Sequence, residues 1–132
     1  MATSIQRQNL DSPDETRTFD QGELQTVTLG DFKVARAVLQ PGWKWSEHVK
    51  PIAQTDSCQV HHTGYVVSGR MKVVMDDGSE TEIGPGDAYV IRPGHDAWVI
   101  SDEAFVGVDV STEMVEKFAK EAGPVDKAKD KI

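Results

Sequence analysis

Turn signals divide the middle of this 132-residue chain into short segments. Four glycine-containing turns stand out: Gly30-Asp31, Pro41-Gly42, Asp77-Gly78 and Gly84-Pro85-Gly86. Between them apolar and polar residues alternate, as in FKVARAVL and DAYVIR, which is the pattern of strands with one buried face. At least seven such strands follow one another, so the sequence predicts an all-β domain, either a sandwich or a barrel.

The two ends of the chain differ from this middle region. Residues 1–22 are polar and predict a flexible N-terminal arm, which a partner subunit could order. Residues 23–111 hold the predicted strands. Residues 112–123 carry apolar side chains at helical spacing and predict a helix across the outer surface of the domain. Residues 124–132 form a charged tail.

Three predictions concern the stretch that leads from the first strands to Gly69. The segment WKWSEHV alternates aromatic and polar residues and predicts a strand. The segment KPIAQTDS predicts a loop, because it contains Pro51 and a Thr-Asp-Ser cluster. The segment CQVHHTGYVVSG predicts another strand, which ends at Gly69.

Charge and composition exclude several classes of partner. The net charge is −8, with 14 basic and 22 acidic residues and no basic patch, so nucleic acid and anionic membranes are not expected partners. No apolar run is long enough to span a bilayer, and the N-terminus does not resemble a secretory signal. A single cysteine excludes an internal disulfide and fits a reducing compartment, which predicts a cytoplasmic protein.

Four residues of types that bind transition metals lie at uneven intervals: His48, Cys58, His62 and His95. Their spacing is too open for a zinc finger, whose ligands come in close pairs. It suits a site assembled inside a barrel from strands that are distant in sequence.

Two motifs resemble those of the cupin superfamily. Gly42, followed by WKWSE and His48, resembles the start of the first family motif, and His62 falls where the family has a glutamate. Gly86 and Gly94 hold their places in the second motif. The resemblance covers roughly residues 32–111. It implies a double-stranded β-helix, also called a jelly-roll barrel, and a homodimer.

The same motifs depart from the family pattern at ligand positions. Lys50 stands where the family has its second histidine, Arg92 replaces a proline, and Ala97 occupies the position of the last histidine. The usual site of three histidines and one glutamate is therefore not carried over intact, and only His48 transfers directly.

Strand alternation predicts how the other ligands are placed. Cys58 and His62 are four residues apart and His95 lies two before Ala97, so all would face the same barrel mouth as His48. His61 has the opposite parity and would face away. Cys58 has an alternative role as a small buried apolar side chain.

The ligand set predicts the type of metal. A thiolate with imidazoles favours zinc, with iron, nickel or copper as alternatives, and disfavours magnesium and calcium. Four protein ligands would close the site and indicate a structural ion, whereas three would leave a position open for catalysis. The sequence leaves this choice open.

Five further residues are candidates for the pocket. The tryptophans could line it or pack in the core, Tyr65 could supply a hydroxyl, and Lys50 and Arg92 could bind a carboxylate near the metal or be solvated surface charges. The candidates are Trp45, Lys50, Tyr65, Arg92 and Trp98.

The function predicted from these features is a small metal-binding cupin that binds or transforms a small organic molecule in its barrel. One alternative is a non-catalytic binding or sensing module with a structural zinc ion or no metal. Another is a scaffold subunit that assembles through its arm and C-terminal helix. The sequence does not decide whether the protein is an enzyme.

Overall fold

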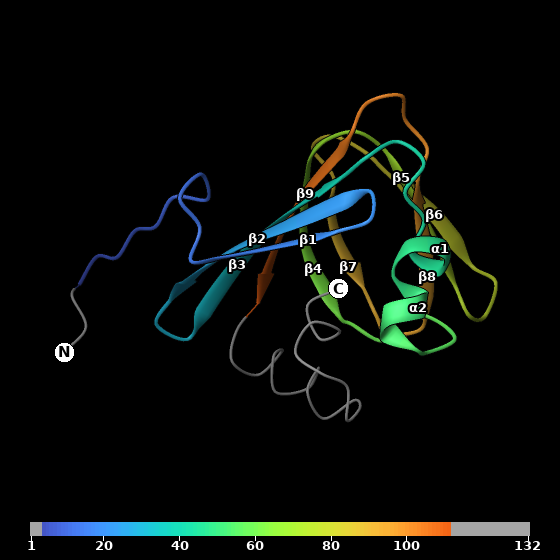
Figure 1. Cartoon of the computed structure of the whole chain (residues 1–132), viewed down its shortest axis with the longest axis horizontal. Helices are drawn as coiled ribbons and strands as arrows, with labels where there is room; N and C mark the ends of the chain where they lie inside the picture. Colours follow the sequence, from blue (N-terminus) through green and yellow to red (C-terminus); the bar gives the residue numbers. More distant parts are fainter. Residues whose placement is uncertain (1–3, 112–132) are drawn as a thin grey trace.

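The computed structural model describes residues 4–111, which form nine strands and two short helices (Figure 1). The strands are β1 (Glu15–Phe19), β2 (Gly22–Leu29), β3 (Phe32–Leu39), β4 (His62–Ser68), β5 (Met71–Met75), β6 (Glu80–Ile83), β7 (Ala88–Ile91), β8 (His95–Val99) and β9 (Phe105–Ser111). The helices are α1 (Trp45–His48) and α2 (Lys50–Ala53).

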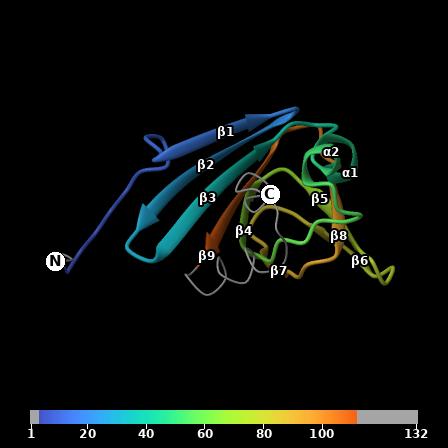
Figure 2. The same cartoon turned by 60° about the horizontal axis from the view of Figure 1, so that its bottom comes forward.

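All strand pairs are antiparallel, and they form two sheets. The larger sheet has the order β1-β2-β3-β9-β4-β7, and the smaller has the order β6-β5-β8. The smaller sheet faces one part of the larger one, while β1, β2 and β3 extend beyond it (Figure 2). Because β9 lies between β3 and β4, the chain crosses between distant strands. This is the all-β, jelly-roll architecture that the sequence predicted.

The hydrophobic core lies between the two sheets. Alternation along each strand directs every second residue inward, so Val66 of β4, Val73 of β5 and Phe105 of β9 are all buried. Each fully buried aliphatic or aromatic side chain of this kind stabilises the fold by about 1.5–3 kcal/mol. The core therefore holds the two sheets together and fixes the side chains at their inner faces.

Strand β1 corrects the prediction of a flexible arm at residues 15–22. It forms a hairpin with β2 in which Phe19 pairs with Gly22 and packs against the core. The turn between them is made by Gln21, whose φ is 65°. Sequence patterns missed this hairpin because its turn uses glutamine, rather than glycine or asparagine, in the left-handed conformation.

Helices α1 and α2 correct the prediction of a strand for WKWSEHV and of a loop throughout KPIAQTDS. The buried residues are Trp45, Val49 and Ala53, which recur every four positions and so lie on one side of successive helical turns. Pro51 lies in the first turn of α2, where a missing backbone N–H costs nothing. The alternation of aromatic residues therefore concealed a helical repeat.

The predicted helix over residues 112–123 and the tail over 124–132 lie outside the described residues. Among the helices that the structure does describe, none has the length and apolar character needed to cross a membrane.

Candidate functional site

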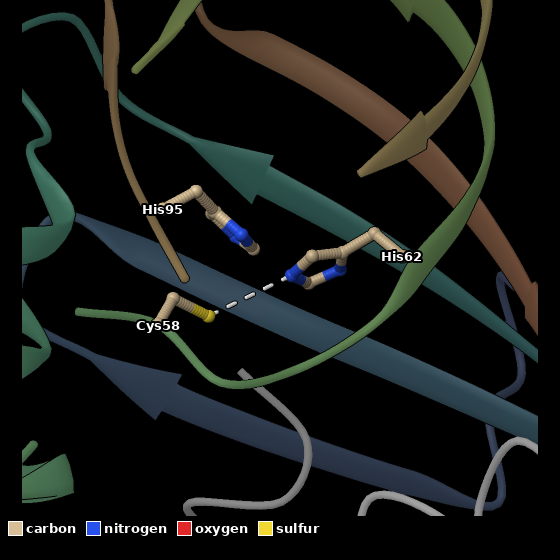
Figure 3. A group of neighbouring side chains, drawn as sticks. All are labelled: Cys58, His62 and His95. Carbon is tan, nitrogen blue, oxygen red and sulfur yellow. Dashed lines mark hydrogen bonds between the residues drawn. The ribbon is translucent and has the colours of Figure 1, made fainter. Parts of the chain in front are cut away.

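Cys58, His62 and His95 converge inside the barrel (Figure 3). Their potential ligand atoms all lie within 4.8 Å of one another, and the Cys58 Sγ is 3.8 Å from the His62 Nε2. The imidazole rings of His62 and His95 meet edge to face, with centroids 5.2 Å apart. Three of the four metal ligands predicted from the sequence therefore lie together.

Backbone hydrogen bonds fix two of these residues to each other. Cys58 forms an isolated β-bridge with His95, in which the Cys58 N–H donates to the His95 carbonyl at 2.7 Å. The Gly94 N–H donates to the Cys58 carbonyl, also at 2.7 Å. Gly94 has a φ of 96°, a conformation that glycine adopts without strain, so the turn before β8 places His95 directly beside Cys58.

Each imidazole has its second nitrogen occupied by an acceptor. The Nδ1 of His95 lies 2.7 Å from the carbonyl oxygen of Arg92, which can only accept, so Nδ1 carries the hydrogen. The Nδ1 of His62 lies 2.7 Å from a carboxylate oxygen of Asp109. With both Nδ1 atoms engaged, the Nε2 atoms are directed toward the cluster, which is the arrangement of metal-binding histidines in general.

Asp109 is in turn held by Tyr89, whose hydroxyl donates to the second carboxylate oxygen. Gly64 makes room for this contact, because a Cβ on it would lie 2.9 Å from the Tyr89 hydroxyl. The sequence analysis did not identify Asp109 or Tyr89. A signal was present, since alternation places Asp109 on the same inward face as the buried Phe105.

The electrostatics of the cluster favour a thiolate beside a charged imidazole. Burial raises the pKa of the Cys58 thiol, but hydrogen bonds and charges from His62 and His95 outweigh it and lower the pKa to about 6. Burial lowers the pKa of His62, but Asp109, assisted by Cys58, raises it to about 10. Burial and the Asp109 carboxylate both raise the pKa of Tyr89 well above its ordinary value, so the phenol stays protonated and donates.

A cavity of about 70 Å³ adjoins the cluster, enough for about two water molecules. Its walls are mostly apolar and come from both sheets, with Leu24, Ile83 and Phe105 among them. Its lining includes the connected polar side chains of Cys58, His62, Tyr89, His95 and Asp109. A mostly apolar cavity with a few convergent polar groups is typical of a small-molecule site.

His48 is the one predicted ligand that does not join the cluster. It lies on α1 rather than on a strand, so the alternation argument does not apply to it. Its Nδ1 lies 3.0 Å from the backbone nitrogen of Lys44, and its Nε2 lies 3.7 Å from a carboxylate oxygen of Asp20. His61 also lies outside the cluster.

Only one of the five candidate pocket residues lines the cavity, namely Trp45. Tyr65 is 50% exposed on β4, and Arg92 is exposed and contributes only its carbonyl, through His95. Trp98 lies under the Lys44 ammonium group at 4.9 Å, and neither Trp98 nor Lys50 is among the cavity-lining residues. Lys50, Tyr65, Arg92 and Trp98 therefore lie outside this cavity, and Arg92 lines a second, more open pocket.

The cluster fits a transition-metal ion. Around tetrahedral zinc, one sulfur and two imidazole nitrogens lie about 3.3–3.6 Å apart. The observed separations, up to 4.8 Å, require a closure of about 1 Å to reach that geometry. Thiolate and imidazole are ligands that zinc and neighbouring transition metals prefer, and both histidines have the outer hydrogen bonds that orient such ligands.

The metal-free protein is expected to be most stable between about pH 6.5 and pH 9. The lowered pKa of Cys58 stabilises the fold above the ordinary thiol value of 9.0, and this contribution is lost as the pH falls through about 6. The raised pKa of His62 stabilises the fold below 6.5, and this contribution is lost as the pH rises through about 10. Between pH 6.5 and pH 9 the pH dependences of these two contributions are opposite and cancel, so the stability of the fold stays constant. Thermal unfolding of chelator-treated protein across this range tests the plateau, and a steady slope through it would contradict the pairing.

Comparisons with known proteins agree with this architecture. A family model described as an EutQ-like cupin domain matches residues 50–119, more than half of the chain. No curated protein matches the chain by sequence.

Solved structures share the fold at low identity. A crystal structure of unknown function from Rhizobium leguminosarum is 19% identical, covers 83% of this chain and 98% of its own, and has a TM-score of 0.61. A cupin 2 conserved barrel domain protein from Salinispora arenicola is 20% identical, with coverages of 90% and 99% and a TM-score of 0.59. A polyketide cyclase from Streptomyces resistomycificus is 17% identical, with coverages of 83% and 80% and a TM-score of 0.59. With the matching family model, the observed barrel and these neighbours, the chain belongs to the EutQ-like cupin domains of the cupin superfamily.

Proposed function

We propose that this cupin binds one divalent transition-metal ion through Cys58, His62 and His95 and uses it to bind or transform a small organic molecule. The observation that carries the proposal is the convergence of these three ligand atoms at the wall of a mostly apolar cavity. Three protein ligands leave a tetrahedral ion one position for water or substrate. A catalytic ion has such an open coordination position, whereas a structural ion does not.

Zinc is the metal that the donor set favours, with iron or nickel as alternatives. Such an ion, when bound, supplies Lewis-acid activation of an oxygen atom of the ligand or of a coordinated water. The chain's own residues orient and shield the reacting molecule. Asp109 holds His62 in place, and the apolar walls, including Phe105, exclude bulk water from the ligand.

The position of His48 supports this proposal over a closed, structural ion. A structural zinc site needs four protein ligands, and the fourth predicted one was His48. Its two ring nitrogens instead face the Lys44 backbone and the Asp20 carboxylate.

A second candidate function uses the same residues without a metal. Cys58, His62 and Asp109 form a hydrogen-bonded series of thiol, imidazole and carboxylate, the order found in enzymes with a nucleophilic cysteine. The lowered pKa of Cys58 supports it. The burial of Cys58, which is 1% exposed, weighs against it because the nucleophile must reach a substrate.

Elemental analysis of protein purified without metal-chelating resin or chelator separates the two candidates. We expect about one equivalent of zinc, iron or nickel per chain, removable by a strong chelator and restored by adding back the metal. Protein with no transition metal, which also fails to take up zinc or cobalt(II), would overturn the metal proposal and leave the cysteine nucleophile.

We also infer a homodimer in the cytoplasm. The family resemblance implies the dimer, and apolar side chains on neighbouring strands support it, because Tyr65 and Val90 are 50% and 59% exposed on β4 and β7. Light scattering that gives the mass of one 14.5 kDa chain would contradict the dimer.

A further inference from the structure

Three buried side-chain atoms have no hydrogen-bond partner among the described residues, and all three are N–H donors: Arg17 Nε, Trp43 Nε1 and Trp45 Nε1. The two tryptophans are 4% and 2% exposed, so water does not compensate their N–H groups at the surface. Buried polar groups in folded proteins are nearly always paired, so two orphan indoles in one small barrel call for a partner that is not part of the chain.

Both tryptophans belong to the cavity beside the proposed metal site. Trp43 and Trp45 are among the residues that line it. The carbonyl of Trp43 accepts from the Val99 N–H, and Val99 is four residues along β8 from His95. That spacing corresponds to about 13 Å of strand, so the backbone at Trp43 lies well away from the cluster.

The third unpaired donor, the Nε of Arg17, belongs to a residue on the face of the larger sheet that lines the cavity. Arg17 pairs with Leu24, which lines the cavity, and two residues further along β1 Phe19 lines it as well. Residues directly paired or two apart on a strand share a face, so Arg17 is on the inner face too. The Nη2 atom of Arg17 lies 3.1 Å from a carboxylate oxygen of Glu15, which compensates the positive charge of the guanidinium. Arg17 therefore contributes a further N–H donor on this face without an unpaired charge.

These donors specify the chemistry of an occupant. The cavity lining contains no lysine or arginine, and its only carboxylate, Asp109, is already engaged by His62 and Tyr89. An occupant that offers an oxygen acceptor would satisfy the indole N–H groups, whereas a donor-only occupant such as an alkylammonium would leave them unpaired.

We propose that the cavity recognises compact, mostly apolar molecules through an oxygen acceptor, a carboxylate or a carbonyl, which takes hydrogen bonds from the indoles of Trp43 and Trp45. The volume of about 70 Å³ limits the enclosed part of an occupant to a small group of atoms. This inference deepens the small-molecule part of the proposed function and does not depend on which metal is bound.

The test uses the full chain as purified, with 15N-labelled tryptophan. The chain has three tryptophans and therefore gives three indole N–H signals. The signal of Trp98, which does not line the cavity, serves as the internal control. The probes are butanoate, butan-2-one and butylammonium, three molecules of similar size that differ in hydrogen bonding. We expect butanoate, butan-2-one or both to move the Trp43 and Trp45 N–H protons downfield in a saturable way. Butylammonium should leave all three signals in place.

Variants make the result quantitative without relying on one substitution. Trp43→Phe and Trp45→Phe, each checked for folding by its remaining signals, should weaken the binding of the acceptor probe about two- to tenfold. Trp98→Phe should leave it unchanged. Equal binding of butylammonium, saturation that moves only Trp98, or unchanged affinity in both cavity variants would overturn the inference.

Failure of this inference is distinguishable from failure of the metal site. Cobalt(II) uptake by the same samples reports on Cys58, His62 and His95 independently of the indole signals. Normal cobalt(II) uptake, with indole N–H signals that do not shift when the probes are added, refutes only the proposed recognition of an oxygen acceptor. Responsive indoles without cobalt uptake refute only the metal proposal.

Discussion

Replacing His62 by alanine is expected to abolish stoichiometric metal binding, lowering the affinity for zinc or cobalt(II) more than about 100-fold. Loss of an outer hydrogen bond alone typically costs 10- to 100-fold in metal affinity, and this substitution removes a ligand together with its outer partner. Competition against a chelator of known affinity measures the change. Cys58→Ser should have a comparable effect and should also remove the thiolate-to-metal charge-transfer absorption of the cobalt(II) form.

The chain offers two matched histidine controls for this prediction. His61 is the sequence neighbour of His62 but lies outside the cluster, and His48 is the predicted ligand that the structure places on α1. His61→Ala and His48→Ala should retain metal at the unmodified stoichiometry and affinity. A drop at His48 equal to that at His62 would mean that four residues bind the ion and that the site is closed.

Removing the carboxylate of Asp109 is expected to weaken metal binding about 10- to 100-fold without removing any ligand. Asp109 fixes the tautomer and orientation of His62, so that its Nε2 points at the cluster. Asp109→Ala loses both the acceptor and the charge. Asp109→Asn keeps an acceptor, so its metal affinity should lie between that of Asp109→Ala and that of the unmodified protein. Tyr89→Phe removes only the hydrogen bond to Asp109 and should have the smallest effect.

The order of the metal affinities of Asp109→Ala, Asp109→Asn and Tyr89→Phe shows whether Asp109 acts by orienting His62 or whether its substitution destabilises the barrel as a whole. Unfolding measured on the metal-free proteins provides the control, because Asp109 is partly exposed and an asparagine there fills the same space. If Asp109→Asn and Asp109→Ala both bind metal as tightly as the unmodified protein, His62 does not need its outer partner. The proposed role of Asp109 would then be wrong.

The strands could be predicted from the sequence because their turns and alternation are local. The hairpin of β5 and β6 illustrates this, with Asp77 and Gly78 at its turn. Helix α1 was missed because Trp43 and Trp45 mimic strand alternation, and the competing repeat of Trp45, Val49 and Ala53 appears only when burial is known.

Cys58, His62 and His95 lie together in the structure, but the alternation argument that placed Cys58 with His62 was wrong. Residues 59–61 are not part of β4, so Cys58 does not reach the site by sharing a strand face with His62. It does so through its backbone bridge to His95, a contact between distant parts of the chain. The partnership of His62 with Asp109 likewise depends on the pairing of β4 with β9, which no local pattern specifies.

The ligand set of a bound ion tests the central claim most directly, and X-ray absorption spectroscopy of the metal-loaded protein measures it. The three-residue site predicts one sulfur and two imidazole nitrogens, with one further light atom from water or a small ligand. For zinc, the sulfur should lie at about 2.3 Å and the nitrogens at about 2.0–2.1 Å. A shell without sulfur, or one with three imidazoles and sulfur, would contradict an open site built from Cys58, His62 and His95.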